Sequence, residues 1–186
     1  MSVFIHGIDM RHILIFLGLL QFSLPSFGHG PTPQKAKEAI TIQAPLSKVW
    51  AVLHQFDAIG FWHPDLKKSE GDGKNASGGT RTLTFANNET LVEELDYYNA
   101  EGHEYSYRLK TENTRAFPTS SYTVEIKVSP ADTPDSSIVS LKSRFYRGDT
   151  GNNPPEHLTD AAAVAAVTQF FKQGLQGLKN HIEKPH

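Results

Sequence analysis

Hydrophobic and polar residues alternate along much of the chain, and this alternation predicts β-strands. A first run extends from Glu38 to Gln43, and a short strand is expected between Leu66 and Glu70. Three longer runs, at 105–110, 122–128 and 139–145, place every second residue on an apolar face. Period-two runs with one polar face are typical of an antiparallel sheet that is covered on one side only.

One long amphipathic helix is expected at the end of the chain. Apolar residues recur at spacings of three and four from Val164 to Ile182, and Thr159 or Asp160 can cap the helix that carries them. A shorter apolar stripe predicts a helix after Pro45. Many strands and one long terminal helix predict an α+β fold in which a curved sheet wraps around the helix and leaves a cavity for an apolar molecule.

Two glycines, Gly174 and Gly177, lie inside the predicted terminal helix. Each costs up to about 1 kcal/mol of helix stability relative to alanine. Two explanations remain open: the glycines make room for a neighbouring backbone or ligand, or they are tolerated on the solvent side.

The N-terminal segment has the pattern of an export signal. A short basic start at Met10–His12 precedes the apolar run Ile13–Leu20, and small residues at Ser26 and Gly28 occupy the two positions that a signal peptidase reads. The apolar run is shorter than the about 20 residues of a membrane span. We expect a signal peptide over residues 1–28, cleavage after Gly28, a periplasmic or secreted protein, and no stable membrane span after cleavage. The alternative is an N-terminal membrane anchor.

Composition narrows the possible partners. Removing 28 of the 186 residues leaves 158, which suits one domain. We expect a flexible lead-in over residues 29–37 and a single ligand-binding domain over 38–186. The net charge of −2 gives no electrostatic footprint for nucleic acid, and the absence of cysteine excludes disulfides, a thiolate nucleophile and a cysteine metal site.

Six sets of short segments carry a resemblance to a known family: Ala44–Trp50, Trp62–Pro64, Gly79–Leu83, Val92–Leu95, Phe117–Pro118 with Tyr122, and Gly174–Leu175 with Leu178. Their order and spacing resemble START-like proteins, also called SRPBCC proteins or the polyketide cyclase-dehydrase type. The resemblance covers essentially all of residues 38–186 and implies the helix-grip fold: about seven antiparallel strands around a long C-terminal helix, with a hydrophobic pocket between them. An exported member of this size is similar to the periplasmic accessory proteins of bacterial methanol oxidation (MxaD-like). That similarity implies a periplasmic dehydrogenase or its cytochrome as partner.

Two charged residues lie on apolar strand faces. Arg81 shares its face with Leu83 and Phe85, and a buried charge needs a partner because burying it alone is expensive. Glu93 also lies on an apolar face, so we predict an Arg81–Glu93 pair. A two-residue turn at Asn87-Asn88 would instead place Glu94 opposite Arg81, whereas an odd-length loop or a bulge restores Glu93.

Aromatic side chains are the other candidates for the pocket. The residue before a proline is held extended, so His63 lies in a stiff turn, and Trp62 beside it lines the pocket rim or fills the core. Tyrosines combine an apolar ring with one hydrogen-bonding group, which suits a semi-polar ligand. The residues predicted to line the cavity are Trp62, His63, Arg81, Glu93, Tyr107, Tyr122, Phe145, Phe171 and Leu175.

The chain contains no metal-binding spacing of histidines, nucleophile elbow, phosphate loop or dinucleotide fingerprint. We therefore predict no cofactor, no metal and no catalytic residue, and favour a non-enzymatic accessory protein that binds a small hydrophobic ligand. One alternative is a cyclase- or hydratase-type enzyme with Glu93, His63 or a tyrosine as general acid/base. Another is a protein-docking module with a vestigial cavity. A cavity of about 300 Å³ or more would favour a ligand, and a filled core would favour docking.

Overall fold

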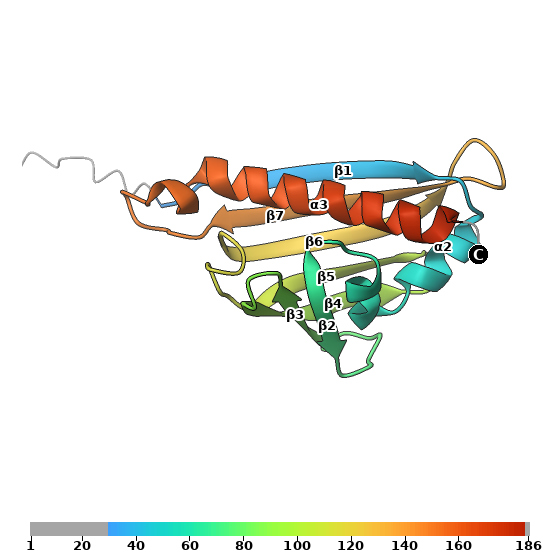
Figure 1. The fold of residues 1–186 in the computed structure, drawn as a ribbon, viewed down its shortest axis with the longest axis horizontal. Coiled ribbons are helices and arrows are strands. Elements are labelled where there is room, and N and C mark those ends of the chain that lie inside the picture. Colours follow the sequence, from blue (N-terminus) through green and yellow to red (C-terminus); the bar gives the residue numbers. More distant parts are fainter. Residues whose placement is uncertain (1–29, 185–186) are drawn as a thin grey trace, which may run out of the picture.

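The computed structural model describes residues 30–184 and contains one seven-stranded antiparallel sheet with a long C-terminal helix (Figure 1). The strand order is β1-β7-β6-β5-β4-β3-β2. The predicted signal peptide over residues 1–28 and its cleavage site lie outside the described residues. The elements are β1 (Gln34–Ile42), α2 (Leu46–Leu53), the 3₁₀ segment η1 (Phe56–Phe61), β2 (Leu66–Gly71), β3 (Thr80–Phe85), β4 (Thr90–Asn99), β5 (Glu104–Thr111), β6 (Thr119–Pro130), β7 (Ser137–Arg147), the 3₁₀ turn η2 (Glu156–Leu158) and α3 (Asp160–Glu183).

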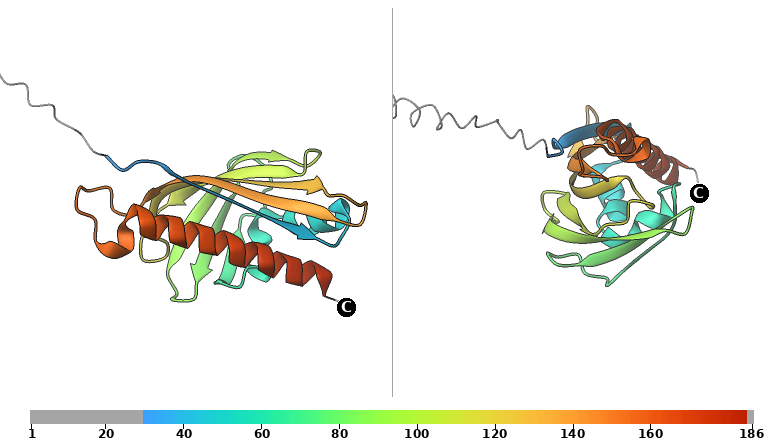
Figure 2. Two further views of the ribbon diagram at one scale, coloured as in Figure 1. Left: turned by 90° about the horizontal axis from the view of Figure 1, so that it is seen from above. Right: turned by 90° about the vertical axis from the view of Figure 1, so that its left-hand side faces the viewer.

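The sheet is curved, and α3 lies along its inner side, packed against β1 and β7 (Figures 1 and 2). Thr159 caps α3, because its side-chain oxygen accepts a hydrogen bond from the Ala162 N–H at 3.3 Å. The apolar stripe of α3 is buried against the sheet, as its periodicity predicted. This arrangement confirms the α+β helix-grip fold.

Both glycines of α3 mark places where the turn after η1 approaches the helix closely. A side chain on Gly177 would collide with the carbonyl oxygen of Trp62, and one on Gly174 would come within 2.6 Å of the His63 ring. The first of the two explanations is therefore correct: the glycines make room for a neighbouring backbone and ring. Because these two glycines have no side chain, Trp62 and His63 can pack directly against α3.

The first strand is longer than the alternation predicted. β1 begins at Gln34 rather than Glu38, so residues 34–37 of the expected flexible lead-in are paired with β7. Lys35 and Lys37 pair with Arg144 and Lys142 in this register. The extra residues alternate only between exposed and half-buried positions. An edge strand with so little burial gives a weak hydrophobic signal, which is why the sequence pattern did not reveal it.

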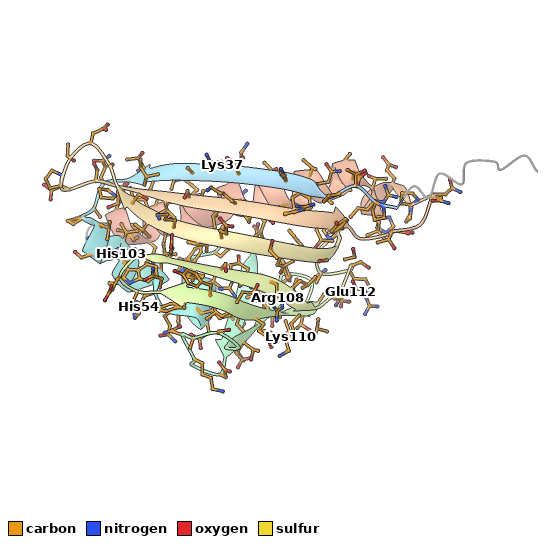
Figure 3. The ribbon with its side chains drawn as sticks, turned by 180° about the vertical axis from the view of Figure 1, so that it is seen from behind. Lys37, His54, His103, Arg108, Lys110 and Glu112 are labelled. Atoms are coloured by element: carbon orange, nitrogen blue, oxygen red, sulfur yellow. The ribbon has the colours of Figure 1, made fainter. Side chains whose placement is uncertain are left out.

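The outer face of the sheet is polar (Figure 3). Arg108 and Lys110 of β5 contact the Glu94 carboxylate at 2.6 and 2.5 Å on this face. Within residues 30–184, no helix is both long and apolar enough to cross a bilayer. The buried apolar residues of the strands lie on the inner side of the sheet, so an interior site must lie between the sheet and the helical segments that cover it.

Candidate functional site

A buried ion pair joins β3 and β4 on the inner face of the sheet. Arg81 lies directly opposite Glu93, and Arg81 Nε donates to Glu93 Oε2 at 2.5 Å. The two residues are only 1% and 2% exposed. In the loop that joins the two strands, Asn88 lies in the left-handed region with a φ of 67°. This loop sets the register that places Arg81 opposite Glu93. The prediction of Glu93 rather than Glu94 is confirmed.

The Arg81 guanidinium is enclosed by aromatic and backbone groups. Its Nη1 donates to the Phe56 carbonyl oxygen at 2.5 Å, and its central carbon lies 4.1 Å from the Phe56 ring centre and 4.6 Å from that of Tyr107. Its Nη2 has no hydrogen-bond partner among the described residues. Burial disfavours the charged form, but the Glu93 carboxylate together with the neighbouring tyrosines outweighs it, so the pKa of Arg81 is raised above its ordinary value. Arg81 therefore stays charged.

Tyr122 of β6 completes this network from the other side of the carboxylate. Its hydroxyl donates to Glu93 Oε1 at 2.5 Å, so both oxygens of Glu93 accept a hydrogen bond. Burial, and then the negative charge of Glu93, raise the pKa of Tyr122 well above its ordinary value. The hydroxyl therefore keeps its proton.

A small cavity lies beside this network, between the sheet and α3. Its volume is about 20 Å³, measured as the space open to the centre of a water molecule, which suits about one water. A second cavity of about 10 Å³ lies next to Trp62 and His63. The ligand-sized cavity expected from the sequence is therefore not open in this structure. The larger cavity is lined by Leu83, Phe85, Leu91, Glu93, Tyr107, Phe117, Tyr122, Val124, Ser143, Val167, Phe170 and Phe171.

Three phenylalanine rings fill the space that a ligand would need. The rings of Phe85, Phe117 and Phe170 have centres 5.4 to 6.1 Å apart and come from β3, the β5–β6 loop and α3. Phe117 and Phe170 are only half-buried. We call these three residues the phenyl cluster. None of the three is among the residues that the sequence predicted to line the cavity. Phe117 lies in a loop without periodicity, although its Phe-Pro motif belongs to the resemblance.

His63 connects the turn after η1 to α3. Its Nε2–H donates to the Phe170 carbonyl oxygen at 3.0 Å, and its Nδ1 accepts from the Asp65 N–H at 3.2 Å. Its ring stacks on Phe170 with 3.9 Å between centres. Burial lowers the pKa of His63 to about 4, and the nearby Arg81 charge adds to this, although the bond to Phe170 opposes it. His63 is thus a neutral imidazole with both nitrogens occupied.

The structure brings together most of the predicted site residues. Glu93, Tyr107, Tyr122 and Phe171 line the larger cavity, while Trp62 and His63 line the smaller one with Tyr107 and Phe171. Arg81 lines neither cavity. Phe145 and Leu175 are buried but line neither cavity. In the part of the chain that the structure describes, no three His, Asp or Glu side chains form a group that could hold a metal ion.

Comparisons with known proteins agree with this fold. The structure is similar to that of an uncharacterised Bacillus thuringiensis protein, with a TM-score of 0.67 and 21% identity over 81% of this chain and 100% of that one. For the protein XoxI from Bacillus cereus the TM-score is 0.67, with 21% identity over 80% and 94% of the two chains. For the Zhui aromatase/cyclase from a Streptomyces species it is 0.65, with 17% identity over 82% and 94%.

These identities are low, so the likeness to solved structures concerns the fold alone. A search of curated protein sequences found no significant match. The sequence itself matches a family profile over residues 33–183, a range that includes every strand and helix described above. The chain therefore belongs to the family described as "Polyketide cyclase / dehydrase and lipid transport".

Proposed function

We propose that this protein binds a small hydrophobic molecule between its sheet and α3, with the polar part of the molecule against Glu93 and Tyr122. The observation that supports this most is the buried Arg81–Glu93–Tyr122 network at the wall of the interior cavity. Replacing a buried ion pair by well-packed apolar residues is often neutral or stabilising. Stability alone therefore gives no reason for two charges at this place.

Binding requires the phenyl cluster to move, because the cavity in the closed structure admits only about one water. Phe117 and Phe170 are half-buried, so their rings can turn toward solvent without breaking a polar contact of their side chains. The measured affinity is then the intrinsic affinity reduced by the fraction of molecules that are open. A ligand of the right chemistry holds the cluster open.

Binding is a better account of this geometry than catalysis. A general acid or base needs a free position next to the substrate and a pKa near the working pH. Both His63 nitrogens already have hydrogen-bond partners, and the pKa of Tyr122 lies well above its ordinary value. We therefore favour a non-enzymatic protein over a cyclase or hydratase.

The proposed setting is the periplasm or the exterior of the cell. It rests on the export-signal pattern of residues 1–28 and on the resemblance to periplasmic accessory proteins of methanol oxidation. In that setting the protein is an accessory factor, and its partner is an alcohol-oxidising dehydrogenase or its cytochrome. Co-purification of such an enzyme with the exported protein would support this part of the proposal, and its recovery only with cytoplasmic proteins would contradict it.

The nearly filled interior favours one other function, that of a protein-docking module. Phe61 at the end of η1 is 83% exposed and offers an apolar side chain on the outer surface for contact with a partner protein. In this alternative the cavity has no ligand, and the outer surface carries the function.

A pair of valine substitutions on α3 separates the two functions. Val167 lines the larger cavity, and Val164, one turn earlier, lines neither interior cavity. We expect the neutral dye N-phenyl-1-naphthylamine to bind the wild type and Val164→Phe with one saturable site. Val167→Phe should bind much more weakly, because the added ring occupies the site.

Unfolding curves of both variants would show whether each remains folded. Equal dye binding by Val167→Phe and the wild type would place the dye elsewhere and contradict the ligand proposal. Absence of binding to all three proteins would leave docking as the better account.

A further inference from the structure

The polar groups of the larger cavity are nearly all hydrogen-bond acceptors. Tyr122 uses its only hydroxyl hydrogen on Glu93 Oε1, and Ser143 Oγ donates to the Thr123 carbonyl oxygen at 2.8 Å. A tyrosine or serine hydroxyl has one hydrogen and free lone pairs, and a carboxylate has lone pairs only. These three side chains therefore offer acceptors to a ligand and no donor.

Tyr107 is the exception on the cavity wall. Burial raises the pKa of Tyr107 well above its ordinary value, so its hydroxyl keeps its proton and can donate it to a ligand. The wall thus combines several acceptors with one neutral donor. A ligand group that matches it must donate a hydrogen bond and is also able to accept one.

The charge of the wall excludes ionic ligand groups. Glu93 lines the cavity, whereas Arg81 lies behind it, bonded to Glu93 and to the Phe56 carbonyl, and lines neither interior cavity. A ligand carboxylate would meet a like charge and acceptors in a buried site. A ligand ammonium would add a second cation to a carboxylate that Arg81 already neutralises. Both leave an uncompensated buried charge.

A hydroxyl group is neutral, donates one hydrogen bond and accepts others. Building on the proposed function, we infer that the ligand is a hydrophobic alcohol or phenol whose hydroxyl group donates to the Glu93–Tyr122–Ser143 wall. Fatty acids and other apolar carboxylates are then poor ligands for the same cavity. The phenyl cluster contacts the apolar body of the ligand.

Three naphthalenes of similar shape test this inference on the full exported chain. 2-Naphthol, 2-methylnaphthalene and 2-naphthoate share their rings and differ only in the substituent. We expect 2-naphthol to bind about tenfold or more tightly than 2-naphthoate, which corresponds to one charge-assisted hydrogen bond. Binding is measured by NMR titration or calorimetry at one pH above 7.

A double variant identifies the wall as the cause of this preference. Arg81→Met with Glu93→Gln replaces the ion pair by neutral groups and gives the wall an amide with two N–H donors. The preference for 2-naphthol over 2-naphthoate should then fall by about tenfold. Tyr122→Phe keeps the ion pair and frees Glu93 Oε1, so this variant should retain the preference and serves as the second test if the double variant does not fold.

The outcomes are distinct for the two proposals. Binding of none of the three compounds contradicts the proposed function itself. Binding of all three with equal affinity, or tightest binding of 2-naphthoate, leaves ligand binding intact and overturns the hydroxyl inference. A preference for 2-naphthol that the double variant keeps, or that Tyr122→Phe loses, also overturns it.

Discussion

Breaking the Arg81–Glu93 pair should destabilise the protein far more than removing it altogether. Arg81→Met leaves the Glu93 carboxylate buried without its cation, and Glu93→Gln leaves the Arg81 guanidinium without its anion. Each single change should lower the free energy of unfolding by about 3–5 kcal/mol, the usual cost of an uncompensated buried charge. The double variant carries no buried charge here, and the amide oxygen introduced by Glu93→Gln would still accept from the Tyr122 hydroxyl. It should therefore be more stable than either single variant.

Urea unfolding followed by circular dichroism at pH 7.5 measures all four free energies. The double-mutant cycle should give a coupling of about 3 kcal/mol or more between the two sites. Glu104→Gln, which removes the exposed contact of Lys127 with Glu104 on the outer face, is the matched control and should change stability little. Additive effects of the two inner substitutions would refute the argument that the charges depend on each other.

Three further predictions follow from other parts of the site. The pKa of His63 is about 4 in the fold against an ordinary 6.5, so His63 contributes about 3 kcal/mol that is present above pH 6.5 and lost as the pH falls toward 4. His63→Gln should flatten the dependence of unfolding free energy on pH in that window; an unchanged slope would show that other groups cause it. Gly177→Ala should lower the free energy of unfolding by about 1–3 kcal/mol, because the new methyl group collides with the Trp62 carbonyl oxygen. This collision should outweigh the higher helix propensity of alanine, and a higher melting temperature of the variant would contradict the prediction. Phe117→Ala should lower the free energy of unfolding by less than the about 3–5 kcal/mol that a fully buried phenylalanine contributes, because Phe117 is only half-buried. It should also increase the rate of dye binding, since the phenyl cluster loses one ring. An unchanged rate in stopped-flow fluorescence would show that Phe117 does not hinder entry of the dye.

Sequence patterns were sufficient for the fold and for the charged part of the site. The alternation in β5, β6 and β7 follows from burial on one face, which the structure shows for all three strands. Arg81 and Glu93 were predictable as a pair because each is a charge on an apolar strand face, and such a charge needs a partner. The Gly174 and Gly177 pattern gave only two alternatives, since a glycine does not identify the group that approaches it.

The closure of the cavity was not predictable from the pattern. The phenyl cluster joins a strand, a loop and a helix that are distant in the sequence, and its packing depends on side-chain rotamers. The cavity volume depends on the same rotamers, so the ligand-sized cavity expected from the fold class did not appear. The start of β1 was missed for a different reason, because an exposed edge strand has little hydrophobic contrast.

The central claim is that the space between the sheet and α3 accepts a ligand when the phenyl cluster opens. Intermolecular nuclear Overhauser effects between the ¹³C-labelled protein and 2-naphthol test it most directly. The account predicts contacts from the rings of Phe85, Phe117 and Phe170 to the naphthalene protons. Contacts confined to the outer face of the sheet around Arg108, or saturable binding with the three rings unperturbed, would contradict it.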